Sequence, residues 1–311
     1  MTDAPHIDND AYAGAAPRLS VLAPFFHDDP RLLLLALDRE ATELAGAVEV
    51  VTLDDGSGDE ELTGRVATVI GRMKLPARLI PLTQNIGRAR GRNRLAAAAR
   101  GDWLMFLDSD MAPDTPRFLE TYLDLIEKGS AAVVCGGFSL HQTPDEPGHA
   151  LHRHMSLKSD CLPAAVRNQA PEKHVFTSNL LVRRDVFEAN RFDEGFSGWG
   201  WEDVEWGMRV ARTQAILHID NTATHLGLDT APAIAAKYEQ SAANFGRVVA
   251  EHLSIVESYP SYRLARMLKT APMLRRWRPA LKAAALMDGV PLPARDFAMR
   301  LYRAALYAEA V

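Results

Sequence analysis

The feature that most constrains the fold of this chain is a regular alternation of short apolar segments and helical segments. Strand-like apolar segments lie at residues 19–24, 48–53, 77–82, 103–107 and 131–138. Segments with helical signals separate them, at residues 29–45, 59–73, 87–100 and 115–128. Strands joined by helical crossovers run parallel, so this order predicts an α/β fold with a mostly parallel, doubly wound central sheet flanked by helices. Ligands bind such sheets at the carboxyl ends of the strands.

Polar side chains follow three of these strands at the point where each strand ends. They are Asp54-Asp55, Asn85 and Asp108-Ser109-Asp110. Because these strand ends meet at one edge of the sheet, three such clusters predict one binding site. Asp55 could accept a hydrogen bond from a nucleotide base or ribose. The alternative is a plain strand-to-helix turn, with Ser57 or Asp59 capping the next helix.

The Asp108-Ser109-Asp110 cluster is typical of a divalent-metal site. Side chains alternate along an extended backbone, so Asp108 and Asp110 point to the same side. Two carboxylates placed in this way repel unless a cation lies between them. Mg²⁺ or Mn²⁺ prefers oxygen ligands and bridges to phosphate oxygens, so we expect one of these ions as the cofactor. The alternative is a surface turn.

The helix predicted at residues 87–100 begins with several arginines. Arg88 and Arg92 are four residues apart and share a face. A helix N-terminus with guanidinium groups suits an anion such as a diphosphate. A solvated basic helix face is the alternative.

Residues 196–203, Phe-Ser-Gly-Trp-Gly-Trp-Glu-Asp, combine indoles, glycines and an acidic pair. The glycines let a flat ligand approach the backbone, and the faces of Trp199 and Trp201 match the C–H face of a sugar ring. Glu202 or Asp203, at the start of a predicted helix, is a candidate general base. The alternative is a capping pair stabilised by the helix dipole, with the indoles in the core.

His225 and His218 are both candidates for a third metal ligand. His225 is favoured because it follows the last strand-like segment, residues 215–219, in a loop rich in Thr and Gly. A lone histidine is more often a satisfied core or surface residue.

The chain changes character twice. Residues 1–17 are predicted to form a loose, disordered tail, and residues 18–230 one catalytic domain, with a nucleotide-sugar half at 18–138 and an acceptor half at 139–230. Residues 139–174 look irregular and are expected to shape a substrate pocket. Residues 231–311 form a helical extension.

Composition excludes several functions. The net charge of −5 excludes general nucleic-acid binding. Two cysteines give no disulfide framework or zinc spacing, and no signal peptide or membrane span is visible, so we expect a cytoplasmic protein. Residues 262–311 carry a net charge of about +7. Basic and apolar residues interleave there, which favours peripheral contact of residues 262–303 with the inner face of a membrane. The alternative is packing on the catalytic domain.

Taken in order, these motifs resemble the inverting glycosyltransferases of family 2, which have the GT-A fold. The resemblance covers residues 19–226 and rests on five groups of motifs. They are Ala23-Pro24, Asp54-Asp55-Gly-Ser, Asn85-x-Gly87 with Arg92-Asn93, Asp108-Ser-Asp110, and the stretch from Thr177 to Asp203, which is similar to the acceptor-side module of galactosyltransferase-type enzymes.

The resemblance implies a role for each residue. Pro24 would line the base pocket, Asp55 would contact the base and Asp108 would lie near the ribose and metal. Asp110 and His225 would complete the metal site. Asp203 would be the catalytic base, with Glu202 and Trp199 holding the acceptor sugar. Trp201 stands where many relatives keep a small residue, so it would narrow the acceptor pocket.

The expected reaction is therefore metal-dependent transfer of a sugar from a nucleoside-diphosphate sugar to a carbohydrate or lipid-linked saccharide. The resemblance favours UDP as the nucleotide, because UDP-sugars are the usual donors in the family. The implied nucleotide-binding set also includes Asn85, Arg88, Arg92 and Ser109. Two alternatives stay open. A sugar-nucleotidyltransferase usually has a Gly-rich triphosphate loop near its N-terminus. The residues that follow Pro24 do not form such a loop. A non-catalytic carbohydrate-binding or assembly subunit would not need the intact acidic residues.

Overall fold

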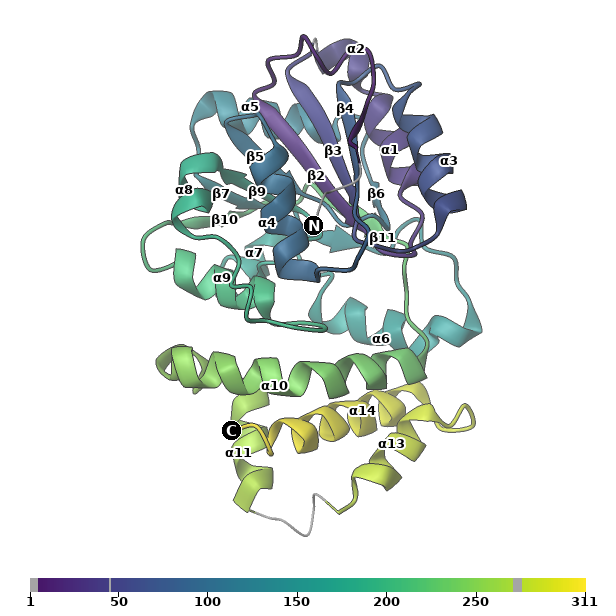
Figure 1. Cartoon of the computed structure of the whole chain (residues 1–311). Helices are drawn as coiled ribbons and strands as arrows, with labels where there is room; N and C mark the ends of the chain where they lie inside the picture. The colour runs from purple at the N-terminus through teal and green to yellow at the C-terminus, as the bar shows by residue number, and fades with distance from the viewer. Residues whose placement is uncertain (1–4, 45, 271–275) are drawn as a thin grey trace.

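An eight-stranded sheet forms the centre of the computed structural model, which describes residues 5–44, 46–270 and 276–311 (Figure 1). The strand order is β1-β4-β3-β2-β5-β9-β7-β10. The strands are β1 (Ile7–Asp8), β2 (Leu19–Phe25), β3 (Val48–Asp54), β4 (Ala77–Pro81), β5 (Trp103–Phe106), β7 (Val133–Cys135), β9 (Leu180–Arg183) and β10 (Ile216–His218).

The predicted parallel sheet is confirmed for most of its strands. β2 runs parallel to β3 and β5, β3 runs parallel to β4, and β7 runs parallel to β10. Two strands reverse the direction: β9 is antiparallel to both β5 and β7, and β1 is antiparallel to β4. Residues 175–179 precede β9 as a loop rather than extending the strand.

Helices cover both faces of this sheet, as the alternation predicted. One apolar cluster joins the sheet to α1, α3 and α5, and the other joins it to α4, α8 and α9. The helices are α1 (Arg31–Asp38), α2 (Ala41–Leu44), α3 (Glu60–Ile70), α4 (Arg88–Ala98), α5 (Phe118–Lys128), α8 (Arg184–Ala189) and α9 (Glu202–Val210). In α3, the Asp59 side chain caps the helix by accepting from the Leu62 N–H.

A second, three-stranded sheet has the order β6-β11-β8 and was not foreseen from the sequence. It consists of β6 (Met111–Pro113), β11 (Ala223–His225) and β8 (Phe138–Ser139). β6 and β11 are antiparallel, and His225 lies opposite Met111. This pairing brings the end of the Asp108-Ser109-Asp110 cluster beside His225.

Residues 139–174 are more regular than expected. They contain α6 (Ala150–Ser159), α7 (Ala164–Arg167) and the short 3₁₀ turns η1 (Pro147–His149) and η2 (Pro171–His174). The prediction of an irregular segment is wrong for α6. Leu151 and Met155 are four residues apart, and both are buried against the C-terminal helices, so tertiary packing stabilises this helix.

The prediction of a loose N-terminal tail is wrong for residues 5–17. Ile7 and Asp8 add an edge strand to the sheet. The Asn9 amide donates to the carbonyls of Met73 and Leu75, and Tyr12 is 3% exposed beneath the guanidinium group of Arg100. These contacts are remote in sequence, which explains why composition alone suggested a tail. Residues 1–4 lie outside the described residues.

The C-terminal helices form a layer beside the carboxyl edge of the sheet. Figure 1 shows α10 lying across the sheet domain next to α6, with α14 on its far side. The helices are α10 (Ala231–Val256), α11 (Pro260–Thr270), α13 (Arg278–Leu286) and α14 (Leu292–Tyr307). In the described part of the chain, no helix has both the length and the apolar character needed to cross a membrane.

Candidate active site

A cavity of about 460 Å³ opens at the carboxyl edge of the central sheet. Its walls come from the strand-end loops, from α4, α6 and α9, and from α10 and α14. Most of the residues that the sequence singled out line it: Pro24, Asp55, Arg88, Arg92, Asp108, Ser109, Asp110, Trp199, Trp201, Glu202, Asp203 and His225. The structure therefore brings the two halves of the predicted site into one cavity.

Asn85 does not line the cavity, so its expected nucleotide contact stays a prediction that the cavity lining does not support. Its side chain is exposed. The neighbouring backbone matters instead, because the N–H groups of Ile86 and Gly87 donate to the Asp55 carboxylate at 2.9 and 3.1 Å. Gly56 makes this turn possible, since a Cβ there would lie 2.1 Å from the Gln84 carbonyl carbon. Asp55 is thus fixed by the loop after β4.

Asp108 faces the arginines of α4. The Arg92 guanidinium is 2% exposed and donates to Asp108 Oδ1 at 2.5 Å. Arg88 Nη2 lies 3.9 Å from Asp108 Oδ2. The alternative of a solvated basic face is wrong for both arginines, because each lines the cavity and contacts a carboxylate. The cavity wall at the end of β5 therefore carries paired positive and negative charges.

Asp110 and His225 meet through the pairing of β6 with β11. His225 Nε2 lies 3.0 Å from Asp110 Oδ2, and the Leu226 N–H donates to the Asp110 carbonyl at 2.9 Å. Adjacent ligands of an octahedral Mg²⁺, each about 2.1 Å from the ion, are about 3 Å apart. These two side chains therefore fit a metal site. Asp108 is turned toward Arg92 and is not grouped with them.

His218, the other candidate ligand, does not line the cavity. Its Nδ1 lies 2.8 Å from Arg167 Nη1, and its Nε2 lies 3.0 Å from the Pro171 carbonyl. An arginine N–H can only donate, so Nδ1 accepts and Nε2 carries the proton. His218 is a satisfied core residue.

The acidic pair at the start of α9 is electrostatically divided. Arg88 Nε donates to Glu202 Oε1 at 2.7 Å. Burial alone would raise the pKa of Glu202, but Arg88 and Arg92 hold that pKa below its usual value. Burial, with the Glu202 charge beside it, raises the pKa of Asp203 to about 7. A carboxylate with this pKa is suited to accept a proton near neutral pH.

The two tryptophans are held from behind by the C-terminal helices. The Trp201 indole N–H donates to the Tyr307 hydroxyl at 3.0 Å, and its ring lies 4.9 Å from that of Phe245. The Trp199 ring lies 6.2 Å from that of Tyr238. Trp201 has a φ of 77°, a backbone conformation that residues other than glycine rarely adopt. This strain occurs at the cavity wall, where α9 begins.

These features led us to compare the chain with known proteins. A family model described as "Glycosyl transferase family 2" matches residues 20–191, more than half of the chain. The chain belongs to glycosyl transferase family 2. The GT-A fold expected from the sequence is confirmed by solved structures.

Two solved structures illustrate the family fold. The mannosyltransferase PcManGT from Pyrobaculum calidifontis, in complex with GDP-Man and Mn²⁺, has a TM-score of 0.60 and 17% identity, covering 94% of this chain and 86% of that one. TarS 1-349 from S. aureus has a TM-score of 0.53 and 18% identity, covering 92% and 89% of the respective chains. At these identities the likeness concerns the fold alone.

Curated relatives match over shorter stretches. An uncharacterized glycosyltransferase, YfnE, from Bacillus subtilis is 24% identical over 239 residues, covering 62% of this chain and 60% of that protein. An N-acetylglucosaminyltransferase from Bradyrhizobium sp. is 31% identical over 97 residues, covering 31% of this chain and 63% of that protein. The chain thus spans less than two thirds of the length of either relative.

Several cavity residues of this family 2 chain were missed by sequence reasoning. His152 on α6 has its ring 5.9 Å from that of His225 and accepts from the Asp229 N–H at 2.6 Å. Burial lowers the pKa of His152 to about 4, so it is neutral. The others lie on α6, α10 and α14 or directly after α6, and include Ser156, Asp160, Lys237, Tyr238, Arg300, Arg303 and Tyr307. The sequence signal that could have revealed the residues on α14 is the spacing of positions 300, 303 and 307, which places them on one helix face.

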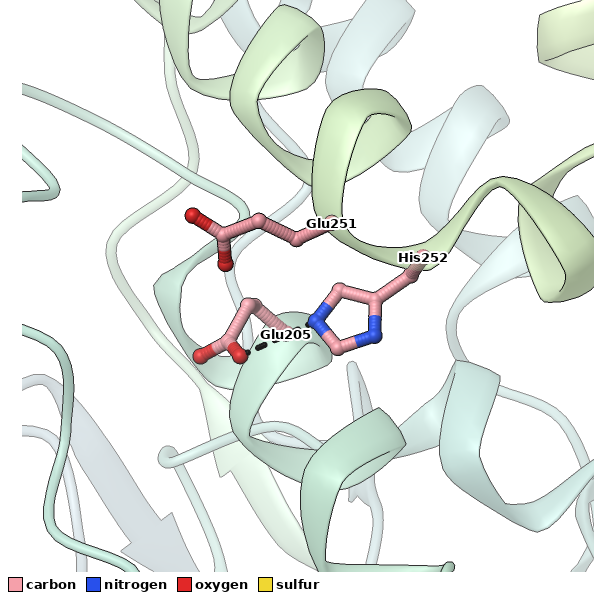
Figure 2. A group of neighbouring side chains, drawn as sticks. All are labelled: Glu205, Glu251 and His252. Carbon is pink, nitrogen blue, oxygen red and sulfur yellow. Dashed lines mark hydrogen bonds and ion pairs between the residues drawn. The ribbon is translucent and has the colours of Figure 1, made fainter.

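Glu205, Glu251 and His252 form a second group of potential metal ligands in this family 2 chain, outside the cavity (Figure 2). His252 Nε2 lies 3.1 Å from Glu205 Oε1, and His252 Nδ1 lies 2.9 Å from Arg212 Nη2. Since arginine can only donate, both ring nitrogens are already in use. Arg209 and Arg247 contact the two carboxylates at 2.6 and 3.1 Å. Three guanidinium groups thus compensate this cluster without a metal, and it fastens α9 to the kink in α10 at His252.

Proposed function

We propose that this chain transfers a sugar from a nucleoside-diphosphate sugar to a carbohydrate or lipid-linked saccharide, with inversion at the anomeric carbon. The observation that carries the proposal is the position of Asp203. This carboxylate, with a pKa of about 7, lines the same cavity as Asp110 and His225. A general base and a metal-binding pair in one cavity match an in-line displacement on a metal-bound diphosphate.

The donor would occupy the strand-end side. Asp55 and Pro24 line the wall expected to hold the base, and Arg88 and Arg92 supply positive charge near Asp108. Asp110 and His225 would hold Mn²⁺ or Mg²⁺. When bound, this ion stabilises the charge that develops on the leaving diphosphate.

The acceptor would lie against the indole-lined side. Trp199 and Trp201 present faces suited to a sugar ring, and Glu202, kept ionised by Arg88, accepts hydrogen bonds from hydroxyl groups. Asp203 takes the proton from the attacking hydroxyl. Attack from the face opposite the leaving group gives inversion.

UDP is the proposed nucleotide. Support comes from the TarS 1-349 structure in complex with UDP-GlcNAc, with a TM-score of 0.54, and from the relative named an N-acetylglucosaminyltransferase. PcManGT, whose structure holds GDP-Man, makes GDP the competitor.

The test is release of nucleoside diphosphate from a panel of UDP-, GDP- and dTDP-sugars, with Mn²⁺ or with EDTA. We expect metal-dependent turnover of a UDP-sugar. Turnover of a GDP-sugar instead would show that the donor nucleotide is GDP, and the proposed reaction would still hold. No turnover, with no donor binding by calorimetry, would leave a non-catalytic carbohydrate-binding subunit. Pyrophosphate release from a nucleoside triphosphate and a sugar phosphate would point to a nucleotidyltransferase.

We further propose that the C-terminal helices make peripheral contact with an anionic membrane surface. Two apolar side chains on α11 do not support this contact, whereas its exposed side chains do. Leu264 and Leu268 on α11 pack against α14 rather than facing outward, whereas Arg263, Arg266 and Met267 are exposed. Arg275, one of the basic residues in this segment, lies outside the described residues.

Charge reversal tests the membrane contact better than truncation, because removing α14 would also remove part of the cavity wall. We expect Arg263→Glu with Arg266→Glu to weaken binding to phosphatidylserine vesicles. Wild-type binding no stronger to these vesicles than to neutral ones would refute the contact.

A further inference from the structure

The far wall of the cavity contains a guanidinium group without a carboxylate partner. Arg303 lines the cavity from α14. Among the residues that the structure describes, no carboxylate oxygen lies within 4.0 Å of its nitrogens. Its guanidinium carbon instead lies 5.0 Å from the ring centre of Tyr238 and 6.0 Å from that of Tyr307.

These two tyrosines place Arg303 on the acceptor side. Tyr238 contacts Trp199, and Tyr307 binds the Trp201 indole N–H. The Tyr307 hydroxyl is already engaged by Trp201 and by Ser241 at 2.8 Å. Arg303 therefore lies behind the sugar-binding face, where Tyr238 is its neighbour and, among the described residues, no carboxylate pairs with it.

The neighbouring charges do not neutralise this wall. The Asp296 carboxylate contacts three basic side chains: Arg300 at 2.5 Å, Lys158 at 3.5 Å and His154 at 3.7 Å. Asp160 also lines the cavity and interacts electrostatically with Arg303. Burial raises the pKa of Asp160, and Ser159 donates to its carboxylate at 2.9 Å.

We propose that Arg303 binds an oxyanion carried by the acceptor, a phosphate or carboxylate group placed beyond the sugar that rests on Trp199 and Trp201. A guanidinium group offers paired N–H donors that match two oxygens of such a group. A guanidinium group has five N–H donors, so a hydrogen bond to the Tyr238 hydroxyl leaves others for the oxyanion. The proposal rests on the proposed function for its acceptor, and it restricts that acceptor to an acidic saccharide or a phosphate-linked saccharide.

The first experiment compares acceptors that differ only in the anion. Glucose 1-phosphate is paired with methyl glucoside, and methyl glucuronide with methyl glucoside, each with the donor found in the panel. We expect kcat/KM to favour an anionic member by about tenfold or more, the effect of one charge-assisted hydrogen bond. Arg303→Gln should remove this preference, and Arg303→Lys should restore part of it. The phosphate and carboxylate arms distinguish the two sources of the oxyanion.

Arg117→Gln is the matched control, because Arg117 pairs with Glu120 on the exposed side of α5, away from the cavity. It should keep the wild-type preference. Arg300→Gln should lower the preference less than Arg303→Gln does, because Arg300 is already paired with Asp296. No preference in the wild type, or an equal preference in Arg303→Gln, would overturn the proposal.

A binding measurement separates this proposal from the proposed function. Tryptophan fluorescence is titrated with glucose 1-phosphate and methyl glucoside while UDP and Mn²⁺ fill the donor side. Tighter binding of glucose 1-phosphate that is lost in Arg303→Gln supports the oxyanion site even if no donor turns over. Nucleotide binding without any preference for glucose 1-phosphate or glucuronide refutes the oxyanion site and leaves the transferase reaction standing.

Discussion

Arg88 Nε donates to Glu202 Oε1 at 2.7 Å, and this contact joins the strand-end side of the cavity to its indole-lined side. Arg88 begins α4, and Glu202 begins α9. The same guanidinium lies 3.9 Å from Asp108. One arginine therefore influences both the acidic cluster that contains Asp108 and the acidic pair that contains Asp203.

The pH dependence of turnover should follow from this arrangement. Burial and then the Glu202 charge raise the pKa of Asp203 to about 7, so the fraction of active base rises with pH through that value. We expect kcat/KM to rise about tenfold per pH unit below pH 7 and to level off above it.

Glu202→Gln tests the cause of that shift. The substitution removes the neighbouring negative charge, so the pKa of Asp203 falls and the rise moves to lower pH. The plateau should also fall, because Glu202 lies on the side of the cavity proposed for the acceptor. An unchanged midpoint in a pH–rate profile would show that Glu202 does not control the base.

Asp203→Asn should abolish most transfer while retaining the donor site. An amide of the same shape cannot accept the proton, and loss of a general base costs about 100- to 10,000-fold in rate. Steady-state kinetics and nucleotide calorimetry together check this. Asp185→Asn is the control, because Asp185 is exposed, pairs with Arg183 and does not line the cavity. Full activity in Asp203→Asn would remove Asp203 from the mechanism.

Local sequence signals predicted the elements that local interactions stabilise. Each apolar segment from residue 19 to residue 107 forms a strand, and each helical segment between them contains a helix, because periodicity and capping act within a few residues. The same reasoning placed Asp55 and Asp110 at strand ends, where a parallel sheet gathers them, and Asp203 at the start of a helix.

Signals between distant segments were invisible. β6 and β11 are three residues each and pair across more than a hundred residues, so no local pattern marks them. α6 depends on burial of Leu151 and Met155 by helices that follow much later. The exposure of Asn85 and the cavity position of Arg303 depend on loop path and helix docking, which periodicity does not determine.

Buried histidines should make the fold sensitive to acid. Burial lowers the pKa of His218 and of His174 to about 4, from about 6.5. The unfolded chain therefore takes up protons below pH 6.5 that the folded chain does not. The stability that these groups contribute is present above pH 6.5 and is lost as the pH falls toward 4, at up to about 1.4 kcal/mol per pH unit for each histidine.

His218→Gln tests the assignment, because glutamine does not titrate. Urea unfolding at pH 7.5 and pH 5 should show a smaller loss of unfolding free energy in this variant than in the wild type. The difference should correspond to the uptake of about one proton on unfolding. Equal slopes for wild type and His218→Gln would contradict a depressed pKa.

Gly227→Ala should damage the metal-binding pair without unfolding the protein. A Cβ at Gly227 would lie 2.1 Å from Asp110 Oδ2 and 3.0 Å from its Cγ, so the carboxylate must move away from His225. We expect nucleotide binding in Mn²⁺ to weaken by about tenfold or more, toward the value measured in EDTA, because a displaced ligand no longer helps to hold the ion. Gly148→Ala is the control, because nothing lies within 4 Å of the added methyl group. Calorimetry with UDP and a thermal melt would check both variants, and wild-type Mn²⁺ dependence in Gly227→Ala would show that Asp110 does not bind the metal in this orientation.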